Sequence, residues 1–131
     1  MKLTPTKKGT AKMGLTRVAV TLRSFTSPDF YKSEFLVDTG ATDSLAPTSE
    51  LTRIGIQPIG TMAYELASGS IVEYKFGLAE ISFMNETTAG RVIFGPDNIE
   101  PILGVTALES VGVIIDPANL TLKRLPAIPL K

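Results

Sequence analysis

One acidic side chain has a setting that suggests chemistry. Asp38 follows the apolar run Phe35-Leu36-Val37 and is followed by Thr39-Gly40-Ala41-Thr42. An apolar run of this kind predicts a buried strand, and the glycine permits the sharp turn after it. The sequence therefore predicts a strand that delivers one carboxylate onto a tight loop.

The residue types that are missing narrow the chemistry further. The chain contains no Cys and no His. Thiol and imidazole nucleophile systems, zinc sites built from these ligands and disulfide frameworks are therefore excluded within one chain type. Carboxylate chemistry remains, and we expect neither a metal nor a cofactor. Because the formal net charge is zero, nothing in the overall field calls for nucleic acid or an anionic membrane as a partner.

Length and composition predict one mostly-β domain. The chain has 131 residues, 44% of them apolar, with 11 glycines and 9 prolines between short runs rich in Val, Ile, Thr and Phe. We expect residues 1–13 to be a flexible, lysine-bearing tail or an expression leader, and residues 14–131 to be the domain. No apolar run is long enough to span a bilayer and no secretion signal is recognisable, so a cytoplasmic protein is expected.

Alternation and turn residues outline the elements that must position Asp38. Strands are expected at residues 15–23, 34–37 and 91–94, short helices at 48–54 and from Thr106 toward Gly112, and a final hairpin at 113–122. Thr48 or Ser49 is the expected N-cap of the first helix, and Thr106 with Glu109 matches a capping box. Residues 61–83 predict a long hairpin whose small-residue tip is Ala67, Ser68, Gly69 and Ser70.

Three of these features occur in the order typical of one family. The Asp38 segment resembles the active-site signature of aspartic proteases, and Ile102-Leu103-Gly104 before a short helix is similar to the second signature of the retroviral type. The hairpin between them lies where that family has its flap. The resemblance spans residues 18–125, and residues 103–109 with 113–117 look like the small soluble prokaryotic branch. It implies an all-β, retropepsin-like closed or partly open barrel with a flap hairpin and one or two short helices.

The resemblance also implies roles for residues. Asp38, Thr39 and Gly40 would be catalytic, while Ala41 and the hairpin tip, Ala67, Ser68, Gly69 and Ser70, would contact an extended peptide. Two carboxyls about 3 Å apart share one proton and so supply an acid and a base at once. Asp38 is the only Asp followed by Thr-Gly or Ser-Gly. The second carboxyl would therefore come from another copy, and activity would require a homodimer.

The sequence departs from the retroviral pattern at two positions. Thr42 and Val105 stand where those proteases have an Asp and an Arg that pair near the dimer interface, and Pro126 and Pro129 shorten any strand beyond Leu125. The geometry and strength of the dimer are therefore open. Asp43 is interpreted as a loop-solvating residue.

Two other functions remain as alternatives. The chain could be a non-catalytic peptide-binding module on the same fold, which the altered interface would favour and the intact signature opposes. A glycosidase that uses two carboxylates is a weaker alternative, because no motif places a second acid at the required separation.

Overall fold

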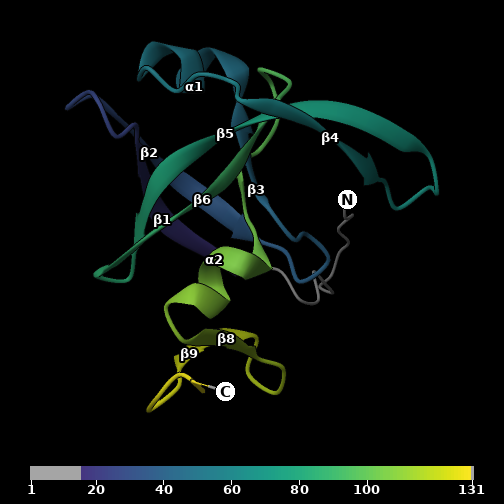
Figure 1. Cartoon of the computed structure of the whole chain (residues 1–131). Helices are drawn as coiled ribbons and strands as arrows, with labels where there is room; N and C mark the ends of the chain where they lie inside the picture. Colours follow the sequence, from purple (N-terminus) through teal and green to yellow (C-terminus); the bar gives the residue numbers. More distant parts are fainter. Residues whose placement is uncertain (1–15, 131) are drawn as a thin grey trace.

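The main sheet of the protein closes on itself. The computed structural model describes residues 16–130. The elements, in chain order, are β1 (Thr16–Arg23), β2 (Phe30–Val37), β3 (Ser44–Pro47), α1 (Thr48–Arg53), β4 (Gly60–Glu65), β5 (Ile71–Phe83), β6 (Glu86–Gly95), β7 (Ile102–Leu103), α2 (Val105–Ser110), β8 (Val113–Asp116) and β9 (Thr121–Arg124). Seven strands run in the order β1-β2-β7-β3-β6-β5-β4, and β1 also pairs with β5. This extra pairing makes a ring of six strands, from which β4 projects with the start of β5 (Figure 1).

The interior of the ring is filled by apolar side chains that alternate along the strands. Val20 and Leu22 of β1, Phe35 of β2 and Ile81 of β5 are at most 1% exposed. Val20 and Leu22 are two residues apart, which places both side chains on the same face of β1. Leu51 of α1 closes the same core cluster. The expected mostly-β barrel with two short helices and a hairpin is therefore confirmed.

The first helix is capped from outside its own sequence. Its N-cap is Pro47, which makes no side-chain cap bond, so the expected cap by Thr48 or Ser49 is wrong. Instead, the Ser49 N–H donates to Oδ1 of Asp97 at 2.7 Å, and the Thr48 hydroxyl donates to the Gly95 carbonyl. A carboxylate at a helix start satisfies a free amide and the local dipole, which typically stabilises the helix by about 1 kcal/mol.

The second helix begins one residue earlier than predicted. Gly104 is its N-cap and no side chain caps it, so the expected Thr106 and Glu109 capping box is not formed. The Thr106 N–H donates to the Thr42 carbonyl at 3.1 Å instead. A tertiary contact has thus replaced the local one.

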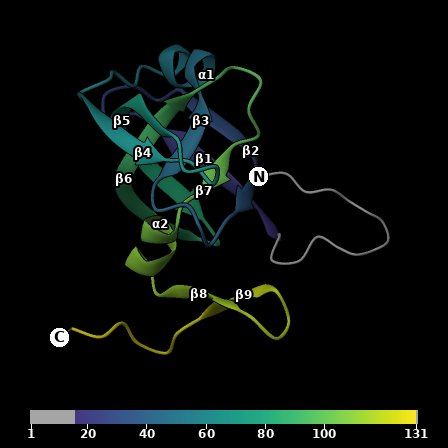
Figure 2. The ribbon, with the colours of Figure 1, turned by 90° about the vertical axis from the view of Figure 1, so that its right-hand side faces the viewer.

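The last two strands form a small sheet of their own. β8 and β9 pair antiparallel as the predicted final hairpin, set beyond α2 and apart from the barrel (Figure 2). Ile115 and Leu122 pack from this hairpin against the core cluster. The predicted boundary between a tail of residues 1–13 and a domain of residues 14–131 lies outside the described residues and stays a prediction.

Gly104 has no room for a side chain. A Cβ there would lie 2.5 Å from the Thr42 oxygen and 2.5 Å from the carbonyl carbon of Asp43, both backbone atoms. We expect Gly104→Ala to lower the free energy of unfolding by about 3 kcal/mol, at the upper end for an overpacked site. Urea unfolding measures the change. Gly90→Ala is the matched control, because its Cβ would meet only the Ile81 side chain at 3.8 Å, and a change within about 0.5 kcal/mol is expected. Equal stability of the two variants would contradict this packing.

Candidate active site

Asp38 lies where β2 leaves the core. Phe35, Leu36 and Val37 are buried, Asp38 is half-buried, and the next two residues are exposed. The Gly40 N–H donates to Oδ1 of Asp38 at 2.9 Å, and the Ala41 N–H donates to the Asp38 carbonyl at 3.0 Å. An aspartate that binds the amide two residues ahead stabilises a tight turn. The loop therefore presents its carboxylate at the surface in a fixed local geometry.

The two signature segments lie side by side, although they are more than 60 residues apart in sequence. β7 is inserted between β2 and β3, parallel to β2 with Val37 opposite Leu103, and antiparallel to β3. The Val105 N–H then donates to the Ala41 carbonyl at 2.9 Å. The segment that contains Gly104 and Val105 thus supports the loop that carries Asp38.

A buried hydroxyl completes this support. Ser44, 2% exposed, accepts the Gly104 N–H at 3.0 Å. A buried amide without a partner would cost roughly 1–3 kcal/mol. Backbone hydrogen bonds to the carbonyls of Ala41 and Thr42 join the same two segments. These segments carry Thr42 and Val105, the two positions at which the sequence departs from the retroviral pattern.

The projecting hairpin (residues 60–76) carries the second group of predicted site residues. At its tip the Leu66 N–H donates to the Ser70 carbonyl, and the Gly69 N–H donates back to the Leu66 carbonyl, both at 2.8 Å. Gly69 has φ +93°, a conformation that glycine adopts without strain. All four predicted tip residues, Ala67, Ser68, Gly69 and Ser70, are exposed.

The structure thus places the predicted site residues in two groups. Asp38, Thr39, Gly40 and Ala41 share one braced loop, and the tip residues lie on the hairpin that projects above it (Figure 1). Within residues 16–130 no hydrogen bond joins the tip to the Asp38 loop directly.

One side chain that sequence reasoning missed connects the two groups. The Tyr64 hydroxyl, on β4, donates to Oδ2 of Asp43 at 2.8 Å. The interpretation of Asp43 as a merely solvating residue is therefore wrong. Strand alternation carried a signal, because Tyr64 pairs with Val72 and so shares the face of Val72, Tyr74 and Phe76. The partner on the loop could not be read from spacing.

The surroundings of Tyr64 raise the pKa of its hydroxyl further above the ordinary pH range. Burial, followed by the hydrogen bond to Asp43 and the charge of that carboxylate, raises the pKa of Tyr64 to about 12, while Arg91 acts in the opposite direction. The Arg91 guanidinium also lies 4.3 Å from the centre of the Phe76 ring. Tyr64 is thus a hydrogen-bond donor across the ordinary pH range.

Two further observations concern the described part of the chain. Among residues 16–130 no three His, Cys, Asp or Glu side chains are grouped so that they could hold a metal ion. No helix in that range has the length and apolar character needed to cross a membrane.

Comparisons with known proteins bear on the same segments. The family model described as aspartyl protease matches residues 31–107, which include both signatures and the hairpin. Among solved structures, the chain is similar to the solution structure of the simian foamy virus (mac) protease, with a TM-score of 0.48 and 17% sequence identity over 68% of this chain and 87% of that one. No curated protein matches the chain.

The family match covers more than half of the chain and contains the whole loop from Asp38 to Ala41 together with the Gly104 segment that supports it. This chain therefore belongs to the aspartyl protease family.

Proposed function

We propose that the protein is an aspartic endopeptidase that hydrolyses peptide bonds as a homodimer, within the small soluble prokaryotic branch of the retropepsin-like group and in the cytoplasm. The observation that carries the proposal is the intact Asp38-Thr39-Gly40 turn at the end of a buried strand. Family membership supports the reaction class. The homodimer, the branch and the compartment are parts of the proposal.

A single Asp38 supplies only half of the required chemistry. Cleavage of a peptide without metal, thiol or imidazole needs one group to take a proton from water and another to give one to the leaving nitrogen. Two adjacent carboxyls that share a proton perform both tasks. Asp43 hydrogen-bonds to Tyr64, and no other Asp of the chain stands in a Thr-Gly or Ser-Gly context. The second carboxyl is therefore assigned to Asp38 of a second copy.

The surface around Asp38 suits such a partner. Thr39 and Gly40 are exposed, and within the described residues the Thr39 hydroxyl has no hydrogen-bond partner. A two-fold axis between equivalent loops would bring the two carboxyls together and give each Thr39 a partner across the axis. The Gly40 backbone would then lie next to the scissile bond.

The projecting hairpin is assigned as the flap. Its exposed tip, Ala67 to Ser70, would lie over an extended peptide and contact it through backbone groups, much as an added strand does. Ala41 would contact the same peptide from below. Water held between the carboxyl pair and the peptide attacks the carbonyl carbon, and the tetrahedral species collapses as the amine takes a proton. No covalent intermediate with the enzyme forms.

The alternative is a peptide-binding module that does not cut. It is favoured by Thr42 and Val105, which remove the ion pair that retroviral proteases place near their dimer interface. The two functions differ in what neutralising Asp38 would do.

Asp38→Asn should abolish peptidase activity while leaving the fold intact. We expect at least a hundredfold loss, about the minimum contributed by a general acid and base, because the amide can neither take nor give the proton. Cleavage of a mixed peptide library by both proteins, with circular dichroism as the check on folding, measures this. Asp29→Asn, on an exposed turn outside the site, is the control and should retain activity. Full activity in Asp38→Asn would refute the assignment, and peptide affinity without cleavage in both proteins would establish the binding module.

A site shared between two copies also predicts dominant inhibition. If wild-type protein, at a concentration at which sedimentation shows it to be dimeric, is mixed with a tenfold excess of Asp38→Asn and subunits exchange, only about one wild-type chain in eleven keeps a wild-type partner. Activity per wild-type chain should therefore fall to roughly a tenth. Adding the same excess of Asp29→Asn should not inhibit. Unchanged activity in the Asp38→Asn mixture, with exchange verified by sedimentation of labelled chains, would contradict the shared site.

A further inference from the structure

The hydrogen bond between Tyr64 and Asp43 joins two parts of the molecule that are supported very differently. Asp43 lies in a backbone that is packed against Gly104 and leads into Ser44, which accepts the Gly104 N–H. Tyr64 lies on β4, which pairs with β5 alone and forms the end of the sheet. The bond therefore attaches the least supported strand of the sheet to one of its best supported loops.

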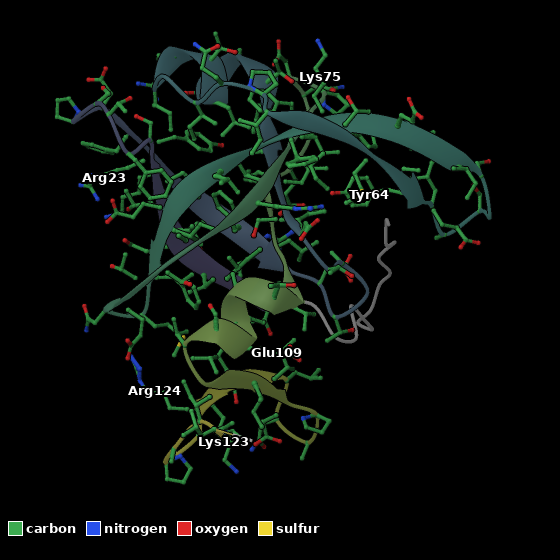
Figure 3. The ribbon with its side chains drawn as sticks, viewed as in Figure 1. Arg23, Tyr64, Lys75, Glu109, Lys123 and Arg124 are labelled. Atoms are coloured by element: carbon green, nitrogen blue, oxygen red, sulfur yellow. The ribbon has the colours of Figure 1, made fainter. Side chains whose placement is uncertain are left out.

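Tyr64 lies next to the tip, so its bond to Asp43 can restrain the tip. Tyr64 pairs with Val72 and lies just before the turn at residues 66–70. Its ring packs 6.4 Å from that of Tyr74, at an interplanar angle of 50°. Figure 3 shows Tyr64 between the hairpin and the loop that follows β2. Within residues 16–130 no other side-chain hydrogen bond or ion pair joins the projecting hairpin to that loop.

We propose that Tyr64 is a positioning residue whose hydroxyl, through Asp43, holds the projecting hairpin over Asp38 before a peptide binds. The inference rests on the proposed function, because it assumes that the peptide enters beneath the hairpin. Tyr64 itself makes no contact with the reacting atoms. Its effect is to order the hairpin in advance, so that less conformational freedom is lost when the peptide binds.

The chemistry of the pair suits this task. A phenol that donates to a carboxylate forms a charge-assisted hydrogen bond, which is stronger than one between neutral groups. Because the Tyr64 hydroxyl remains protonated over the ordinary pH range, ionisation of the phenol does not break its hydrogen bond to Asp43 in that range. Both ring and hydroxyl are used, since the ring packs on Tyr74 and the hydroxyl binds the loop.

Tyr64→Phe removes the hydroxyl and keeps the ring. We expect KM for a cleaved peptide to rise about tenfold, the change that corresponds to losing one charge-assisted hydrogen bond, with kcat changed less than about threefold because the carboxyl pair is untouched. Asp43→Asn keeps an oxygen acceptor without the charge and should raise KM by only about threefold. The double variant should be no worse than Tyr64→Phe, because the two side chains act through one bond. Tyr74→Phe is the matched control, since within the described residues that hydroxyl makes no hydrogen bond, and its KM should be unchanged.

Hydrogen exchange of the protein without peptide gives a readout that does not need catalysis. In Tyr64→Phe the amides of Leu66 and Gly69, which close the tip turn, should exchange several-fold faster, while core amides such as that of Val92 keep their rates. Unchanged exchange at the tip would refute the positioning role even if the enzyme cuts peptides. A lower KM in Tyr64→Phe would also refute it, because the bond would then hold the hairpin against peptide entry. Faster tip exchange in a protein that cleaves no peptide would leave the attachment standing and reject the proposed function.

Discussion

The arrangement of the whole molecule depends on the insertion of a two-residue strand into the centre of the sheet. β7 reaches its place between β2 and β3 only because Gly104 allows the chain to pass within contact distance of the backbone at Thr42 and Asp43. Without this close approach β2 and β3 would have no common neighbour, and the ring would open at that point. The same approach brings the amide of Val105 to the carbonyl of Ala41. The same close approach at Gly104 therefore both closes the barrel and supports the Asp38 loop.

A contrast in backbone support follows from this arrangement. The Asp38 loop is held by backbone bonds on a buried base, whereas the projecting hairpin leaves the barrel with one strand paired on a single side. A reaction between two carboxyls and a water requires fixed geometry, while entry and release of a polymer require a part that moves. For the proposed peptidase, the Asp38 loop would meet the first requirement and the projecting hairpin the second. Tyr64 is the described side chain that connects the projecting hairpin to the loop that follows β2.

The sequence predicted the turns that carry the candidate site better than the contacts that support them. Asp38, the tip glycine and Gly104 were recognisable because each belongs to a short local pattern with a strong backbone requirement. β3 was missed, because four residues of Ser-Leu-Ala-Pro show no clear alternation and pair with strands distant in sequence. Both predicted helix caps were wrong for a related reason, since Asp97 and the Thr42 carbonyl come from other parts of the fold. Contacts made across the fold leave no periodicity in a single sequence.

The double pairing of β1 also determines where this protein is open to unwanted association. Ring closure gives every other strand of the main sheet at least two neighbours, and in the described part of the chain β4 is the one strand of that sheet that pairs with a single neighbour. That strand is six residues long and begins at a glycine. A foreign strand that extends the main sheet, whether in an aggregate or in a useful complex, would find the whole outer side of β4 free, next to the hairpin tip.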